Sequence, residues 1–81
     1  MYYVYILRSL KDGKHYIGST DNLERRINEH NAGKTMSLKR RLPLKIIYQE
    51  EYFTRIEAIK REKNIKRYKG GNAFKKLIKG R

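Results

Sequence analysis

The sequence of 81 residues contains no cysteine, no tryptophan and a single proline. Without cysteine the chain can form neither disulfides nor thiolate metal sites, and a reducing compartment suits it. No proline-rich or low-complexity linker interrupts it, so we expect one domain over residues 1–81, near the lower size limit for a hydrophobic core. The initial apolar run ends at Arg8 and is too short for a membrane span. No basic region precedes this run as in a signal peptide.

Negative charge is scarce: the chain has 8 Asp and Glu residues and 21 Lys and Arg residues, which gives a formal net charge of +13. Such an excess repels itself, and a polyanion is its usual partner. We therefore expect DNA, or alternatively RNA, as the partner. A membrane surface is disfavoured because the basic stretches show no clean amphipathic face. The cations expected to contact phosphate are Lys34, Lys39, Arg40, Arg41, Lys45 and Lys66.

Two short runs of alternating apolar residues flank the turn signal Asp12-Gly13 and predict a β-hairpin. A two-residue turn at this signal would place Ser9 opposite Tyr16. Because side chains alternate between the faces of a strand, Tyr5 and Tyr16 would then share one face of the sheet. The hairpin thus predicts two phenol groups close together.

Capping and stop signals divide the rest of the chain. Two pairs have the spacing of capping boxes, Asp21 with Glu24 and Thr54 with Glu57. Helix stops are expected at Gly33 and at Gly70-Gly71. The sequence predicts an α/β or α+β domain of order β-β-α-β-α-α, a small three-stranded, mostly antiparallel sheet covered by helices. The expected elements lie near residues 2–8, 14–19, 21–33, 44–52, 54–68 and 72–78.

Two polar residues fall on the inward stripe of the first expected helix. Arg26 and His30 are four residues apart, so they are neighbours on the helix, and they share a face with Leu23 and Ile27. An arginine on this stripe needs a partner or a solvent-filled cleft. Considered one at a time, each residue has a purely structural alternative. The arginine could extend past the edge of the core into solvent, and the histidine could form its hydrogen bonds with neighbouring groups.

An acidic residue, Glu62, falls inside the apolar arc that Ala58 and Ile65 define on the second long helix. A carboxylate on the apolar side of so basic a helix requires a cationic partner. One alternative is an ion pair with Lys66 or Arg26. The other is a divalent cation, since Mg²⁺ often takes only one or two carboxylates together with waters and phosphate oxygens.

The segments Tyr3-Val4-Tyr5 and Tyr16-Ile17-Gly18 resemble the two name-giving motifs of the GIY-YIG nuclease superfamily, and Arg26 and His30 follow at the family's spacing. The first motif departs from the name by having Tyr3-Val4 in place of Gly-Ile. An asparagine common in relatives is not assigned, Asn72 being the nearest candidate. Further segments resemble small stand-alone bacterial GIY-YIG proteins, which are related to the N-terminal nuclease domain found in the bacterial excinuclease: 30–34, 41–43, 57–66, 69–71 and 74–78.

The resemblance implies a mechanism of phosphodiester hydrolysis. Glu62 would hold one Mg²⁺ or Mn²⁺ ion against the scissile phosphate, where the ion acts as a Lewis acid. Arg26 would neutralise charge that develops in the transition state. Tyr5 would orient or deprotonate the attacking water, with Tyr16 and His30 in support. Which tyrosine acts stays open.

The resemblance implies a metal-dependent DNA endonuclease for repair-type or branched DNA, in the bacterial cytoplasm and associated with the nucleoid. No second DNA-binding domain is evident, so any specificity must come from the basic loop and helices or from a protein partner, and the oligomeric state stays open. Two alternatives are a non-catalytic nucleic-acid-binding module of the same fold and a small basic ribonucleoprotein component. Only the enzyme needs Tyr5, Tyr16, Arg26 and Glu62 together.

Overall fold

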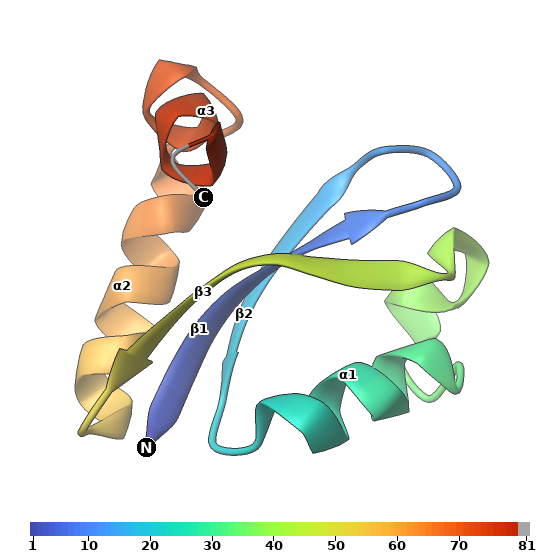
Figure 1. The fold of residues 1–81 in the computed structure, drawn as a ribbon, viewed down its shortest axis with the longest axis horizontal. Helices are drawn as coiled ribbons and strands as arrows, with labels where there is room; N and C mark the ends of the chain where they lie inside the picture. The colour runs from blue at the N-terminus through green and yellow to red at the C-terminus, as the bar shows by residue number, and fades with distance from the viewer. Residues whose placement is uncertain (80–81) are drawn as a thin grey trace.

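The computed structural model describes residues 1–79, so residues 80 and 81 of the expected domain lie outside the described residues. The element order confirms the predicted β-β-α-β-α-α arrangement of an α+β fold. A short 3₁₀ helix, η1, is added within the expected basic loop. No helix in the described part is long and apolar enough to cross a membrane. The elements are β1 (Tyr2–Ser9), β2 (His15–Thr20), α1 (Leu23–Asn31), η1 (Met36–Arg41), β3 (Leu44–Tyr52), α2 (Arg55–Arg67) and α3 (Asn72–Lys79), as Figure 1 shows.

The three strands form an antiparallel sheet of order β2-β1-β3, with β1 in the centre. The predicted two-residue turn is wrong, because Leu7 rather than Ser9 lies opposite Tyr16. The loop begins after Ser9, the last residue of β1, whose hydroxyl accepts hydrogen bonds from the backbone amides of Lys11 and Asp12, both at 3.2 Å. The observed pairing of β1 with β2 differs from the predicted pairing by two residues, and a shift by an even number leaves each side chain on the same face of the sheet. The prediction that the Tyr5 and Tyr16 side chains lie on one face is therefore confirmed.

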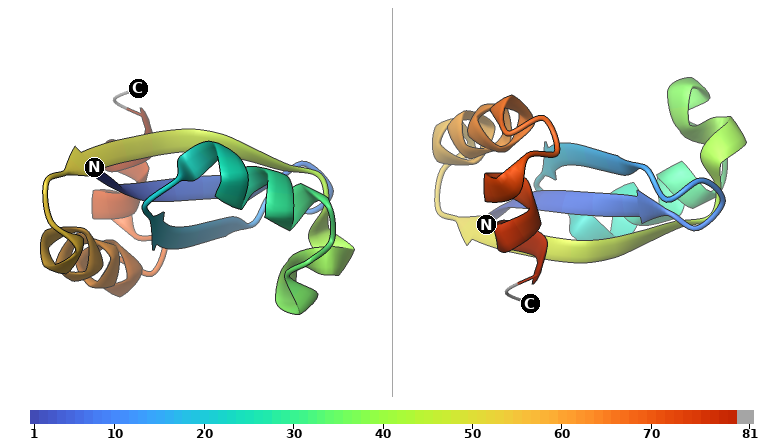
Figure 2. Two further views of the ribbon diagram at one scale, coloured as in Figure 1. Left: turned by 90° about the horizontal axis from the view of Figure 1, so that it is seen from below. Right: turned by 90° about the horizontal axis from the view of Figure 1, so that it is seen from above.

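Both faces of the sheet are covered by helices. On one face, Val4 and Ile6 pack with Ile65 of α2 and with α3. On the other face, Tyr5 and Leu7 pack against α1 and η1. Figures 1 and 2 show α2 and α3 on one side of the strands and α1 on the other. Residues of α1 and α2 approach one another around β2, one of the two edge strands.

The helix ends follow from local hydrogen bonds. Asn22, rather than the predicted Asp21, caps α1, because its extended backbone lets its side chain accept from the Arg25 amide at 3.0 Å. Asp21 instead forms an ion pair with the Arg25 guanidinium at 3.1 Å. The predicted cap at Thr54 and the predicted stop at Gly33, which has φ +78°, are both confirmed.

An ion pair that the sequence patterns do not predict joins β3 to α2. Arg61 donates to both carboxylate oxygens of Glu50, at 2.8 and 3.0 Å, and the hydroxyls of Tyr48 and Tyr52 also donate to this carboxylate. Burial opposes ionisation of Glu50, but the hydrogen bonds from Arg61 and the tyrosines outweigh it and hold its pKa below the usual value. Burial, together with the nearby carboxylate, raises the pKa of Tyr52 to about 12. The cluster fixes the position of α2 on the sheet.

Candidate active site

The residues predicted from the sequence line one hollow of about 570 Å³ around the edge strand β2. Tyr5 and Tyr16 reach it from the face of the sheet that α1 covers, and Glu62 reaches it from α2 on the other side. The geometry therefore brings together residues up to 57 positions apart in the chain. The hollow is lined by all five predicted side chains, Tyr5, Tyr16, Arg26, His30 and Glu62, together with Gly18, Ser19 and Lys66 among others.

A chain of three polar side chains runs from the hollow through the buried His30 to Thr35, the residue before η1. The Tyr5 hydroxyl lies 3.3 Å from Nε2 of His30, and Nδ1 of His30 lies 2.6 Å from the Thr35 hydroxyl. Tyr5 and His30 are both buried, with 5% and 4% of their surfaces exposed. Burial lowers the pKa of His30, and the positive charge of Arg26 lowers it further, against a smaller opposing effect of Glu29. The imidazole is therefore neutral at pH 7, with one ring nitrogen available as an acceptor.

Gly18 of the second motif makes room for the Tyr5 phenol. The two residues lie opposite one another on β2 and β1. A Cβ atom at position 18 would lie 2.6 Å from Cζ of Tyr5 and would also collide with its hydroxyl oxygen. The position thus requires glycine because of the space that the ring occupies.

Glu62 lies on the wall of the hollow with 18% of its side chain exposed. Ser19 donates to Oε1 at 2.6 Å, and Nζ of Lys66 lies 2.6 Å from Oε2. Of the two cations considered from the sequence, Lys66 is therefore the ion-pair partner. Arg26 instead lies 3.9 Å from Glu29, and 44% of its side chain is exposed. Sequence reasoning missed Ser19, although strand alternation from Gly18 places it on the face that α2 covers.

Of the six cations expected to bind phosphate, only Lys66 lines the hollow around β2. Lys34, Lys39, Arg40 and Lys45 are exposed on the loop and elements that follow α1. Arg41 forms an ion pair with Asp12 of the hairpin loop. Hydrogen bonds from the Lys14 amide and from Arg41 lower the pKa of Asp12 to about 2.

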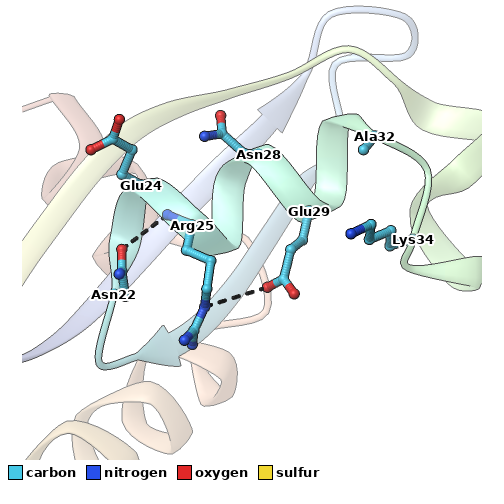
Figure 3. Close-up of a pocket in the computed structure, with 7 residues that line it drawn as sticks. All are labelled: Asn22, Glu24, Arg25, Asn28, Glu29, Ala32 and Lys34. Atoms are coloured by element: carbon cyan, nitrogen blue, oxygen red, sulfur yellow. Dashed lines mark hydrogen bonds and ion pairs between the residues drawn. The ribbon is translucent and has the colours of Figure 1, made fainter.

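A shallow hollow of about 490 Å³ follows the outer face of α1, as Figure 3 shows. Its charged side chains have both signs, and Arg25 lies 3.8 Å from Glu29 across it. Its lining comes from α1 and the residues flanking that helix, so no second element contributes. It contains none of the predicted catalytic residues and is a solvated helix surface. The lining residues are Asn22, Glu24, Arg25, Asn28, Glu29, Ala32 and Lys34.

The donor atoms of the hollow around β2 fit a hard divalent cation held by one protein carboxylate. Residues 1–79 contain no group of three or more His, Asp or Glu side chains placed to enclose a metal. Mg²⁺ is commonly bound through one or two carboxylates, with waters and substrate phosphate oxygens completing its shell. Glu62 offers such a carboxylate at the edge of an open space. The donor set of this hollow is therefore compatible with a divalent cation that takes its other ligands from water and phosphate.

Comparison with known proteins shows the family to which the chain belongs. The family model of the GIY-YIG catalytic domain matches residues 1–75. The chain therefore belongs to the GIY-YIG domain family, and the resemblance inferred from the motifs is confirmed.

Within this family, the chain is similar to small proteins named UPF0213. A UPF0213 protein of Staphylococcus saprophyticus is 38% identical over 80 residues, covering 98% of this chain and 96% of the relative. Another, from Staphylococcus haemolyticus, is 44% identical over 68 residues, covering 83% of this chain and 82% of the relative. The solution NMR structure of a UPF0213 protein from Bacillus halodurans has a TM-score of 0.60 at 32% identity, covering 98% of this chain and 84% of that one.

Proposed function

We propose that the protein is a divalent-metal-dependent DNA endonuclease that hydrolyses phosphodiester bonds in repair-type or branched DNA. The observation that carries the proposal is the position of Glu62, whose carboxylate lines the same hollow as Arg26, Tyr5 and Tyr16. A basic chain with net charge +13 brings a phosphate backbone to this hollow. Membership of the GIY-YIG family supports the same activity.

Glu62 holds the Mg²⁺ or Mn²⁺ ion in this proposal. When bound, the ion supplies Lewis-acid stabilisation of charge on the scissile phosphate and the leaving oxygen. The hydrogen bond from Ser19 fixes the orientation of the Glu62 carboxylate. Lys66 is more than half exposed, and an ion pair of this kind contributes at most about 1 kcal/mol. Its ammonium is therefore free to move from the carboxylate to a phosphate oxygen.

Tyr5 orients the attacking water and removes its proton. As the phenol oxygen takes the proton of the water, the phenol passes its own proton to Nε2 of His30, which lies 3.3 Å away. In the tautomer that this step requires, Nδ1 carries the hydrogen and donates it to the Thr35 hydroxyl, so that Nε2 is the acceptor. Tyr16 lies on the same side of the hollow and supports the position of the water.

Arg26 stabilises the transition state in this proposal. Its guanidinium lines the hollow and its nearest carboxylate, that of Glu29, is 3.9 Å away. The donor fork is therefore available to bind two phosphate oxygens as negative charge develops on them.

Phosphate contact by this surface does not read bases, so we further propose that preference for a DNA structure comes from shape or from a protein partner. We place the protein in the bacterial cytoplasm, in association with the nucleoid.

The test is cleavage of a fluorescently labelled branched DNA in the presence of Mg²⁺ or Mn²⁺. Glu62→Gln is expected to lower the cleavage rate at least about a hundredfold, since loss of metal stabilisation costs several kcal/mol. Binding of the same DNA persists or strengthens, because a negative charge is lost. The matched control is Glu51→Gln, which removes the same charge from an exposed site on β3 and should cut normally. Wild-type protein that binds without cutting would identify a non-catalytic nucleic-acid-binding module.

A further inference from the structure

A second hollow, of about 280 Å³, lies beside the candidate active site. It is bounded by the turn between β2 and α1 on one side and by the first turn of α2 on the other. Ser19 and Arg26 line both hollows, so the two spaces meet at these side chains. We name it the arginine hollow, after Arg25, Arg26 and Arg55 in its lining.

One face of α2 forms a wall common to both spaces. Arg55 and Ile59 line the arginine hollow, and Glu62 and Lys66 line the candidate active site. Their spacing of four, three and four residues places all of them on one side of the helix. At roughly 1.5 Å per residue this wall is about 16 Å long, and it follows the edge strand β2. The two hollows are therefore successive positions along one groove.

The arginines of this hollow differ in how far they are neutralised. Arg25 lies 3.1 Å from Asp21 and 3.8 Å from Glu29, so two carboxylates balance it. Arg26 has only Glu29 nearby, at 3.9 Å. The Arg55 side chain makes no ion pair or hydrogen bond with any residue in the range 1–79. Two guanidinium groups, those of Arg26 and Arg55, are thus available to an anion.

The position of Arg55 is unfavourable for the helix itself. It is the first residue of α2, where the positive end of the helix dipole favours acidic side chains. Thr54 and Glu57 already provide the capping interactions at this end. An anion in the arginine hollow would offset this repulsion.

We propose that the arginine hollow binds a backbone phosphate of the nucleic-acid strand whose scissile phosphate lies at Arg26 and Glu62. The inference rests on the proposed function and adds a second phosphate subsite to it. Arg55 holds this phosphate with its planar donor fork, Arg26 lies between the two phosphates where the hollows meet, and the groove fixes the path of the strand along β2. Because the contact is to the backbone, it orients the strand without selecting a sequence.

The first test measures DNA binding with Glu62→Gln protein, so that no cleavage interferes. Arg55→Gln is added in one variant and Arg67→Gln in another, the latter removing the same charge from the exposed far end of α2, outside both hollows. Using a branched DNA between 50 and 200 mM salt, we expect Arg55→Gln to weaken binding about tenfold and to lower the slope of log K against log salt by about one. Arg67→Gln should change the affinity less than threefold. Equal effects of the two variants would overturn the inference.

A second readout separates this inference from the proposed function. In the ¹⁵N spectrum of wild-type protein without added metal, titration with a thymidine tetranucleotide should shift the side-chain Nε–H resonances of Arg55 and Arg26. An Arg55 resonance that does not move would contradict the subsite. If the wild-type protein never cuts but Arg55 passes both tests, only the hydrolytic proposal fails. If cleavage depends on Glu62 while Arg55→Gln leaves KM unchanged, only the subsite fails.

Discussion

Replacing Gly18 by alanine tests the packing on which the position of the Tyr5 phenol depends. The new methyl group would lie 2.6 Å from Cζ of Tyr5, well inside van der Waals contact. The ring cannot swing outward without cost, because Tyr5 is 95% buried and packs with Leu7, Leu38 and Leu44. Either the ring or strand β2 must therefore move.

The change in the free energy of unfolding that Gly18→Ala causes is the sum of two opposing contributions. Forcing an extra methyl group into a packed core costs about 1–3 kcal/mol, whereas Gly→Ala at an unstrained position gains about 0.4–1 kcal/mol through the unfolded state. Gly18→Ala should therefore lower the free energy of unfolding by about 1–2 kcal/mol. For a domain of this size the melting temperature should fall by roughly 4–16 °C. The displaced phenol should also lower any cleavage rate.

The assay is a double-mutant cycle measured by urea unfolding. In a Tyr5→Leu background the space beside residue 18 is free, so Gly18→Ala should cost nothing or stabilise the protein slightly. The coupling energy between the two positions should be at least about 1 kcal/mol. An equal cost of Gly18→Ala in both backgrounds would show that contact with the phenol is not the reason for glycine.

Two further predictions concern stability. Glu50→Leu leaves the Arg61 guanidinium without its carboxylate, and we expect urea unfolding to show that the free energy of unfolding falls by about 1–3 kcal/mol. This is less than the loss for a fully buried pair, because both side chains are partly exposed. A loss under about 0.5 kcal/mol, the size of ordinary surface substitutions, would mean that the ion pair does not hold α2 on the sheet. The folded-state pKa of His30 lies below its usual value, as does that of His15, which burial and Arg8 lower. Around and below about pH 6.5 the unfolded chain therefore binds more protons than the folded protein, and the free energy of unfolding should fall from pH 7 to pH 5. In the His15→Gln, His30→Gln double variant the free energy of unfolding should depend less on pH over this range. An equal pH dependence in the two proteins would refute the assignment to these histidines.

The element order could be predicted because local signals agree with the final fold. Thr54 and Gly33 mark helix ends through interactions within a few residues, and β3 spans the predicted residues 44–52. The hairpin register was predicted wrongly because the turn dipeptide competes with Ser9, whose hydroxyl holds the loop amides. The cap at Asn22 was missed because Asp21 has equal capping chemistry, and the backbone angles of the turn decide between them.

The candidate site was predictable where residues lie on regular elements. Helical spacing placed Arg26, His30 and Glu62 on inward faces, and the structure brings them to one hollow. Contacts between residues that a turn of the chain brings together could not be predicted from the spacing of residues in the sequence. Thr35 reaches His30 only because the chain turns at Gly33, so no periodicity links the two side chains.

The ion pair of Glu50 could have been suspected in part. Strand alternation places Glu50 on one face with Tyr48 and Tyr52, where a carboxylate needs a donor. Its partner, Arg61, is 11 residues away on α2, and several other cations on that helix were equally plausible. Only the packing angle between helix and sheet selects one of them.

The central claim is that Glu62 supports hydrolysis at the hollow around β2. The most direct measurement is the single-turnover cleavage rate of a branched DNA, at saturating protein and in Mg²⁺ or Mn²⁺, for wild type and Glu62→Gln. We expect the wild-type rate to be at least about one hundred times that of Glu62→Gln, with DNA affinity preserved. Equal rates in the two proteins would contradict it.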